Sequence, residues 1–426
     1  MQKSLWRRHP MKEDFSFMNE KIKAKPFYKK RWVQIAAATI VLAVVFGAIS
    51  SFVFAKVSDW METKHNKEAM TDIEIPKDEE EHSENATEQP SNTEPETIVV
   101  DAQMTPEDYS ILYAAFRGLV KDTRKSLVTV TAVSNDVDWF NEEYQNQGQA
   151  TGMIVGDNGV ELLVLTEYAT IASCDGINVS FVDDTSAAAV LKKYDITTNL
   201  AVISVNLSDI SEGTKAKIVK ATLGNSTRLE AGTPVIAIGR VDGSEDSMKV
   251  GTLTSTQTAQ SVVDAEYKVL VTDMIKNTGA DGVLLNMNGE IVGIMQQQHL
   301  SANMQNVLTA YSISDIKGLL EHLSNNQDIV YLGIKGVTVT NEALKSGVPS
   351  GVYVTEVEID SPAMFGGIQT GDVIQAINGQ IISSMQEFSD VLSRLSNKQS
   401  ITLEGQRLTK DGYKKTNYQA SLSVLE

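Results

Sequence analysis

Apolar residues are distributed unevenly along this chain, and each kind of distribution predicts a different structure. Residues 33–55 form an almost unbroken apolar run, VQIAAATIVLAVVFGAISSFVFA. At about 1.5 Å per residue, such a helix is long enough to cross a hydrocarbon core of about 30 Å. Residues 56–107 are mostly polar and acidic and cannot bury enough surface to offset their ordering entropy. We therefore predict a transmembrane helix followed by a disordered acidic stalk.

The segment before the apolar run is basic, and the segment after it is acidic. Residues 1–32 hold Lys and Arg close to the run. The positive-inside bias therefore predicts a cytoplasmic tail at 1–32 and an extracytoplasmic location for everything after Lys56. A cleaved signal peptide is the alternative, because Val53 and Ala55 resemble a cleavage site. The run is longer than a usual signal core, so we favour an uncleaved anchor.

From 108 to 325 the pattern changes to short β-branched runs separated by tight turns. Runs such as TGMIV, ELLVLT, LAVISV, PVIAIGR and KVLVTD are typical of strands, and Asn288-Gly289 is typical of a hairpin turn. Many short strands over some two hundred residues predict an all-β barrel or sandwich. Residues 326–426 mix strands with one amphipathic helix, predicted from Met385 to Leu395, and are expected to form a separate α+β domain.

The composition of the chain argues against several kinds of ligand and cross-link. The formal net charge of −18 argues against nucleic-acid binding, which needs a basic surface. The single cysteine, Cys174, excludes an internal disulfide and is interpreted as a small packed side chain. No His, Cys or Asp cluster has the spacing of metal ligands, so neither a metal nor a cofactor is predicted.

Three segments of the middle domain resemble the catalytic segments of HtrA/DegP-type, chymotrypsin-like serine proteases. The segment TDMIKNTGADGVLLNMNGEIVGI resembles the one that carries the nucleophilic serine, with Asp281 at the serine position. Residues 163–171 resemble the segment that carries the histidine, which falls at Ala169. Residues 195–202 resemble the segment that carries the aspartate, which falls at Asn199. The resemblance implies a chymotrypsin-like double β-barrel with a degenerate triad.

The lack of a histidine in the middle domain does not depend on how these segments are aligned. No histidine occurs between His82 and His299, so no imidazole is available at the usual place to take a hydroxyl proton. Loss of a complete triad costs roughly a factor of 10⁶ in turnover. We also considered a rebuilt site that uses His299 and Ser301.

The loop Gly279, Ala280 and Asp281 corresponds to the former oxyanion loop. A carboxylate there would oppose an oxyanion, by about 4 kcal/mol at 4 Å and an effective dielectric near 20. Two roles for Asp281 remain open: a turn residue that bonds its own backbone, or an acceptor for the amides that would otherwise hold the oxyanion.

The C-terminal domain resembles a PDZ domain. Residues 361–374, SPAMFGGIQTGDVI, fit the family's "SPAxxAGIxxGDxI" pattern. Tyr331-Leu332-Gly333-Ile334 resembles the carboxylate-binding loop, and Phe388 and Leu392 of the helix would complete a pocket for an apolar C-terminal side chain. The alternative is a closed groove in a domain that only packs on the barrel.

Together these patterns predict a membrane-anchored pseudoprotease of the bacterial cell envelope that binds protein or peptide C-termini through its PDZ domain. The first alternative is an active HtrA-type endopeptidase of protein quality control with a non-standard catalytic set. The second is a subunit that associates with an active paralogue. The resemblance also implies a homotrimer as a candidate assembly.

Overall fold

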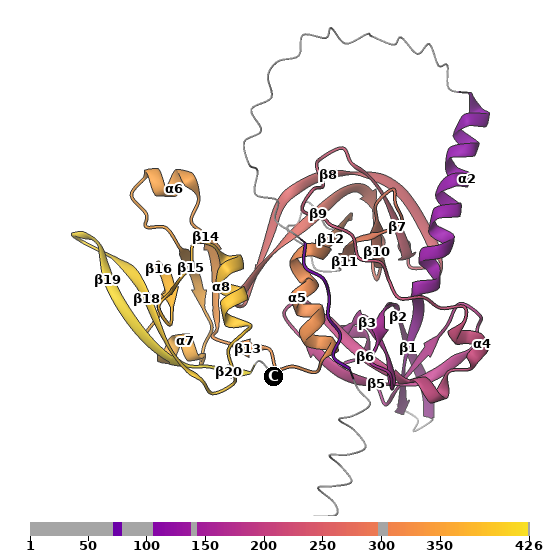
Figure 1. The fold of residues 1–426 in the computed structure, drawn as a ribbon, viewed down its shortest axis with the longest axis horizontal. Coiled ribbons are helices and arrows are strands. Elements are labelled where there is room, and N and C mark those ends of the chain that lie inside the picture. Colours follow the sequence, from indigo (N-terminus) through magenta and orange to yellow (C-terminus); the bar gives the residue numbers. More distant parts are fainter. Residues whose placement is uncertain (1–70, 79–104, 138–142, 297–305, 425–426) are drawn as a thin grey trace, which may run out of the picture. The chain divides into compact units, whose positions relative to one another are not determined.

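The computed structural model describes residues 71–78, 105–137, 143–296 and 306–424 (Figure 1). The predicted tail at 1–32, the apolar run at 33–55, most of the stalk, and both His299 and Ser301 lie outside these residues. Within the described ranges, no helix is both long and apolar enough to span a bilayer. The transmembrane helix therefore stays a prediction from the sequence.

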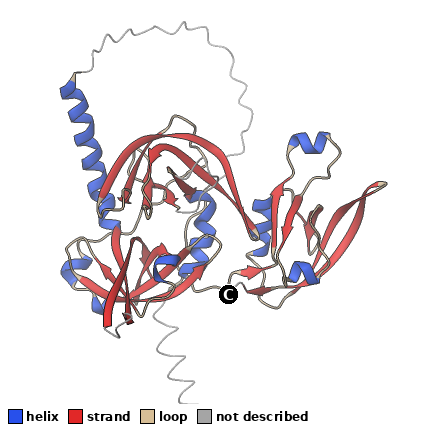
Figure 2. Ribbon diagram, turned by 180° about the vertical axis from the view of Figure 1, so that it is seen from behind, coloured by secondary structure: helices blue, strands red, loops and turns tan. Residues whose placement is uncertain are grey.

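Strands dominate the described chain, as predicted (Figure 2). Six strands form a first closed barrel in the order β1-β2-β3-β6-β5-β4. In β1, Val128, Val130 and Ala132 are buried while Thr129 and Thr131 between them are only half-buried, the period-2 pattern that one barrel interior requires. The strands are β1 (Leu127–Val137), β2 (Glu143–Asp157), β3 (Glu161–Glu167), β4 (Gly176–Ser180), β5 (Ser186–Asp195) and β6 (Leu200–Asn206).

A second closed barrel follows with the order β10-β11-β12-β9-β8-β7. The double β-barrel is thus confirmed. Its strands are β7 (Pro234–Arg240), β8 (Ser247–Val262), β9 (Ala265–Ile275), β10 (Asp281–Leu285), β11 (Ile291–Met295) and β12 (Val307–Ser312). The helical segments around the two barrels are α2 (Pro106–Thr123), η2 (Arg124–Ser126), α3 (Tyr168–Ile171), η3 (Leu207–Asp209), α4 (Glu212–Lys215) and α5 (Ile313–Ser324).

The C-terminal domain is α+β. Its main sheet has the order β14-β15-β16-β18-β19, with β17 paired to β16, and β13 pairs with β20. The strands are β13 (Val330–Tyr331), β14 (Ile334–Thr338), β15 (Val352–Val357), β16 (Asp372–Ile377), β17 (Gln380–Ile381), β18 (Ser400–Thr409), β19 (Gly412–Ser421) and β20 (Ser423–Val424). Three helices accompany them: α6 (Asn341–Lys345), α7 (Pro362–Phe365) and α8 (Met385–Leu392).

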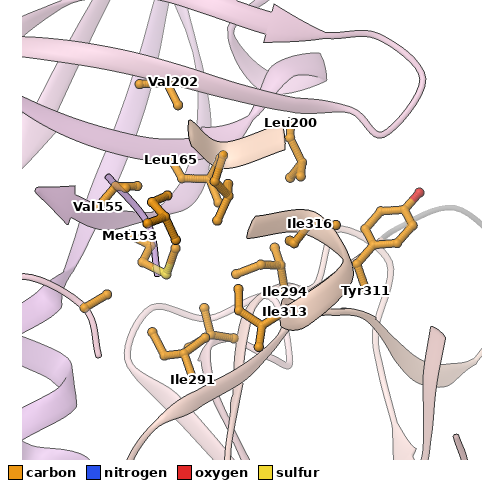
Figure 3. Packing of buried hydrophobic residues seen from close by; sticks show 14 of the residues in the cluster. Met153, Val155, Leu165, Leu200, Val202, Ile291, Ile294, Tyr311, Ile313 and Ile316 are labelled. Atoms are coloured by element: carbon orange, nitrogen blue, oxygen red, sulfur yellow. The ribbon is translucent and has the colours of Figure 1, made fainter. Parts of the chain in front are cut away.

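One apolar cluster contains buried residues of both barrels and holds the two barrels together. Met153 and Leu165 of the first barrel, Ile294 of the second, and Ile313 and Ile316 of α5 belong to this one cluster (Figure 3). Burial of a side chain of this size contributes roughly 1.5–3 kcal/mol. The edges of β2, β3 and β10 that frame the candidate site are held by this packing.

One part of the predicted stalk is ordered. Ile73 and Ile75 are 7% and 4% exposed and join the apolar cluster between the barrels. The backbone of Ile73 exchanges two hydrogen bonds with the side chain of Asn325, at 2.8 and 2.9 Å. Lys317 forms an ion pair with Asp78 at 2.8 Å. The prediction of a solvated stalk was wrong for residues 71–78, because two isoleucines suffice to dock a short segment on a preformed apolar surface.

Candidate functional site

The positions aligned with the histidine and the aspartate of the protease triad lie together. Asn199 ends the turn before β6 with a φ of 61°, a left-handed conformation that Asn tolerates. Its side-chain oxygen accepts the backbone N–H of Ala169 at 2.7 Å, and its Nδ2 donates to Oε1 of Glu167 at 2.9 Å. The amide of Asn199 therefore holds the start of α3 in place, where an aspartate would orient an imidazole in the related proteases.

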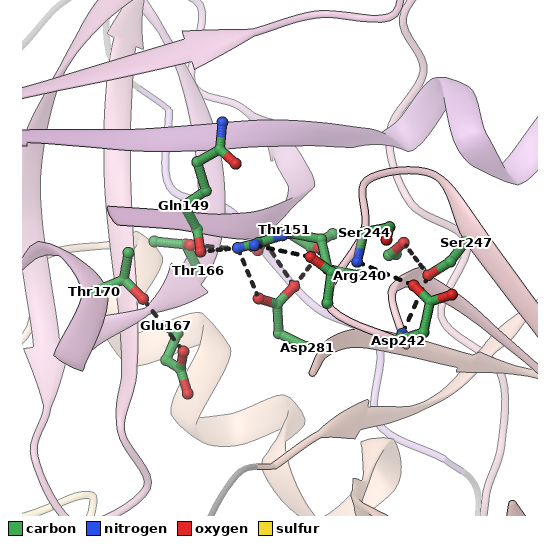
Figure 4. Close-up of polar contacts among 12 residues, drawn as sticks. Gln149, Thr151, Thr166, Glu167, Thr170, Arg240, Asp242, Ser244, Ser247 and Asp281 are labelled. Carbon is green, nitrogen blue, oxygen red and sulfur yellow. Dashed lines mark hydrogen bonds and ion pairs between the residues drawn. The ribbon is translucent and has the colours of Figure 1, made fainter. Parts of the chain in front are cut away.

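Asp281, at the nucleophile position, is fixed to the other barrel. It is 7% exposed, and its Oδ1 accepts the backbone N–H of Thr151 on β2 at 2.9 Å and also the hydroxyl of Thr151 (Figure 4). Its Oδ2 lies 3.8 Å from a guanidinium nitrogen of Arg240. The other nitrogen contacts of Arg240 go to the carbonyls of Gln149 and Gly243. Asp281 thus connects β10 to β2 and not to its own loop, so neither role considered for it from the sequence is observed.

The backbone next to Asp281 explains its position. Gly282 has a φ of 136°, and a Cβ on it would lie 2.1 Å from the carbonyl oxygen of Ile238. Only glycine allows β10 to approach β7 this closely. In the former oxyanion loop, Gly279 has a φ of 75° and the amide of Ala280 donates to the carbonyl of Asn277 at 3.2 Å. That amide is already engaged within the loop.

Three ionisable side chains at this site, Glu167, Lys276 and Asp281, are largely shielded from water. Burial raises the pKa of Glu167 to about 7, and the nearby carboxylate of Asp281 adds to this shift. Burial also raises the pKa of Asp281, although the hydrogen bonds from Thr151 and the charge of Arg240 oppose the change. Burial lowers the pKa of Lys276, whose ammonium group donates to the carbonyl of Gln296 at 2.7 Å. Burial therefore shifts the pKa of each of these three groups in the direction that favours its neutral form.

The space at this site is small. Glu167, Asn199 and Asp281 line a cavity of about 40 Å³. Its volume is well below the roughly 150 Å³ of an engineered cavity that accepts benzene. Among the described residues the one histidine is His322 of α5, which does not line this cavity. Residues 71–78, 105–137, 143–296 and 306–424 thus provide no imidazole here to activate a hydroxyl.

The predicted peptide-binding residues of the C-terminal domain also lie together. Leu332, Ile334 and Phe388 are fully buried and Leu392 is 3% exposed, all within one apolar cluster. Gly333 has a φ of 94°, and a Cβ there would lie 2.3 Å from Cβ of Ser361. This conformation turns successive backbone N–H groups toward one point, which is the geometry of an anion site. Binding of an external peptide by these residues stays a prediction.

A carboxylate already lies at that point. Asp264, in the turn between β8 and β9, accepts the backbone N–H groups of Leu332 at 2.7 Å, Gly333 at 2.8 Å and Ile334 at 3.0 Å. Asp264 is 7% exposed. Its own N–H donates to the carbonyl of Ile334 at 2.7 Å. The carboxylate at the loop thus belongs to a side chain of the same chain, whereas the one predicted from the sequence was a peptide C-terminus, whose binding stays a prediction.

Sequence reasoning missed four residues of these two sites: Thr151, Glu167, Arg240 and Asp264. Glu167 lies within the recognised segment 163–171, and an acidic residue at the end of a buried strand is a usable signal. Asp264 interrupts the apolar tip Val262-Val263-Asp264-Ala265 in the same way. Thr151 and Arg240 carry no local signal, because their roles depend on contacts across the two barrels.

Known protein families match the two folded parts of the chain. Residues 150–294 match the family described as trypsin-like peptidase domain, and residues 330–422 match the PDZ domain. The serine protease Do-like HtrA of Bacillus subtilis (strain 168) is 26% identical over 269 residues, which cover 59% of this chain and 58% of that protein. The probable periplasmic serine endoprotease DegP-like of Pseudomonas putida (strain GB-1) is 30% identical over 265 residues, which cover 61% and 53%. The chain thus spans little more than half the length of these curated relatives.

A solved structure gives the same result for the fold. The HtrA-type protease AlgW with decapeptide has a TM-score of 0.52 at 21% identity, covering 73% of this chain and 99% of that one. The fold and the matched families define a trypsin-like peptidase domain followed by a single PDZ domain. The chain is similar to proteins named as HtrA- or DegP-type serine proteases.

Proposed function

We propose that this chain is an HtrA-like pseudoprotease, a scaffold or sensor that binds peptide or protein termini and does not cleave them. The observation that supports this most strongly is the state of Asp281. A residue at the nucleophile position is tied by two hydrogen bonds to Thr151 on the other barrel and faces Arg240. A carboxylate cannot replace the activated hydroxyl of acyl transfer, and no described imidazole is near.

The neighbouring positions support the same conclusion. Ala169 has no side chain that could accept a proton, and Asn199 uses its amide to hold the backbone of Ala169 and the carboxyl of Glu167. We infer that the degenerate triad Ala169, Asn199 and Asp281 now serves packing at the junction of the barrels. The cavity of about 40 Å³ at this place is too small for a peptide side chain of ordinary size.

The competing function is proteolysis, which the names of the relatives favour, since they are serine proteases. Casein hydrolysis by the purified chain separates the two. The pseudoprotease predicts no cleavage under conditions in which a control HtrA-type protease, diluted about a thousandfold, is still detected; this margin lies well within the roughly 10⁶-fold cost of a lost triad. Cleavage that is lost on replacing His299 or Ser301 would establish a rebuilt site instead.

The binding function is proposed for the PDZ domain. The loop 331–334 has the geometry of a carboxylate site, and the similar AlgW structures are named as complexes with a decapeptide or a tripeptide. We propose an apolar C-terminal residue as the preferred ligand, with Phe388 and Leu392 beside it. Titration with peptides that end in an apolar or a polar residue tests this preference, and the same peptides with an amidated C-terminus test the need for the carboxylate.

We further propose that residues 33–55 anchor the protein in the bacterial cell membrane, with the N-terminus in the cytoplasm and the later domains outside. This rests on the length of the apolar run and on the basic flank before it. Recovery in the membrane fraction after carbonate extraction, with protection of residues 1–32 from external protease, tests both parts. Association with a triad-bearing paralogue would be detected by co-purification from the same membranes.

A further inference from the structure

The β8–β9 hairpin of the second barrel reaches the peptide groove of the PDZ domain. Its strands β8 and β9 both contact β14, and β9 also contacts α8 (Figure 1). A PDZ domain accepts an extended peptide between a strand and a helix, which are β14 and α8 here. Val262 and Ala265, which flank the turn, are each 6% exposed. The hairpin tip is therefore buried against the groove.

The hairpin makes the contacts that a peptide terminus would make. The carboxylate of Asp264 accepts the N–H groups of Leu332, Gly333 and Ile334, and the N–H of Asp264 donates to the carbonyl of Ile334 at 2.7 Å. A peptide C-terminus bound by β-augmentation likewise combines a carboxylate in a nest of amides with main-chain bonds to the adjacent strand. In Asp264 a side-chain carboxylate takes the place of the terminal one.

Further contacts continue along the same edge of β14. The hydroxyl of Ser261 donates to the carbonyl of Gly336 at 3.0 Å. Residues 334 and 336 are two apart along the strand, so their bonds to the hairpin use the same edge of β14. The other edge of β14 is paired with β15. The free edge on which a peptide strand would add is thus covered by the hairpin.

We propose that Asp264 is an internal ligand that keeps the PDZ groove closed, and that an external C-terminus binds only by displacing it. The inference rests on the proposed peptide-binding function and gives its regulation. Each backbone N–H has one hydrogen to donate, so the three amides cannot hold two carboxylates at once. The observed affinity for a peptide is then reduced by the fraction of molecules whose groove is open.

The test compares the full-length chain with Asp264→Asn in detergent solution. Asparagine keeps the shape of the side chain and tolerates the φ of 59° at this position, but it lacks the charge. Asp273→Asn is the matched control, because Asp273 lies on the same hairpin and bonds Thr252 of β8 instead of the PDZ loop. The probes are fluorescent ten-residue peptides that end in Val, Leu or Phe, each with a free and an amidated C-terminus.

Asp264→Asn is expected to bind at least one free-carboxylate peptide at least about tenfold more tightly than the natural chain. A tenfold gain corresponds to about 1.4 kcal/mol of binding free energy that the natural chain uses to displace Asp264. The Asp273→Asn protein should match the natural chain, and amidated peptides should bind to none of them. Hydrogen exchange at residues 332–334 gives a second readout, in which the Asp264→Asn protein should lose protection.

Equal peptide affinity in the natural chain and in Asp264→Asn would overturn the closure while leaving peptide binding intact. Failure of every form to bind any free-carboxylate peptide, with the amides of 332–334 deprotected in Asp264→Asn, would refute the proposed peptide-binding function and displacement with it. Unchanged protection of these amides in Asp264→Asn would show that Asp264 does not hold the loop, and would overturn the inference whatever the peptides do.

Discussion

Replacement of Thr151 by valine tests the structural role that we assign to Asp281. The hydroxyl of Thr151 donates to Oδ1 of Asp281, which is 7% exposed, and the backbone N–H of Thr151 donates to the same oxygen at 2.9 Å. Thr151→Val removes the first bond and keeps the second. A hydrogen bond to a charged group contributes about 1.5–3 kcal/mol, so the second barrel's attachment to β2 should weaken by about 2 kcal/mol when Asp281 is ionised.

The size of this loss should depend on pH. The bond from Thr151 lowers the pKa of Asp281, against the larger effect of burial, which raises it. Once the carboxyl is protonated, the lost bond is one between neutral groups, and its contribution falls to about 1 kcal/mol. Thr151→Val should therefore lose more stability at pH 8 than at acidic pH.

Urea unfolding, followed by far-UV circular dichroism at both pH values, measures this difference. Thr129→Val is the matched control, since Thr129 of β1 lies directly opposite Thr151 in the barrel and is also half-buried. Its free energy of unfolding should change by no more than about 0.5 kcal/mol. Equal, small effects of the two substitutions at pH 8 would refute the view that Asp281 is held by Thr151.

Ile75→Ala should lower the free energy of unfolding by about 2–5 kcal/mol in urea titrations, because Ile75 and Ile73 are buried between the barrels; an effect below about 0.5 kcal/mol would mean that residues 71–78 are not docked. Glu167 has a pKa of about 7 in the folded chain, above the value near 4.5 expected when it is unfolded, so the folded state gains from its protonation. Its stabilising contribution is complete below about pH 4.5 and is lost as the pH rises through 7, by up to about 3 kcal/mol, and Glu167→Gln should remove this slope from unfolding measured between pH 5 and 8. On α2, Tyr109 and Ile111 are 57% and 66% exposed, and the sequence resemblance gives a homotrimer as a candidate assembly. If α2 forms the interface of such a trimer, Ile111→Glu should yield monomers in light scattering, whereas an unchanged mass would exclude α2 from the interface.

The fold was predictable because its information is local. Alternation of Val128, Val130 and Ala132 with threonines predicts a half-buried strand, and similar runs recur through the middle domain. The recognised segments then placed Ala169, Asn199 and Asp281 in one site, and the structure brings Asn199 and Asp281 to the same cavity.

The contacts of these residues were not predictable in the same way. Thr151 and Asp281 are separated by 130 positions, and their bond depends on the register of two barrels. The docking of Asp264 depends on a hairpin reaching a different domain. Ile73 was overlooked because two isoleucines in an acidic segment do not stand out until a complementary apolar surface exists. In each case the missing information is a long-range packing partner.

The proposed pseudoprotease holds no activated hydroxyl in its trypsin-like domain. Fluorophosphonate labelling of the full-length chain, followed by intact-mass analysis and peptide mapping, tests it most directly, because the reagent reacts with an activated serine whatever its partners. A control HtrA-type protease in the same mixture shows that the reagent is active. We predict no adduct on any serine or threonine of this chain. A stoichiometric adduct at one residue, at Ser301 or at Thr151 for example, that disappears when that residue is replaced by alanine would contradict the account and identify a working protease.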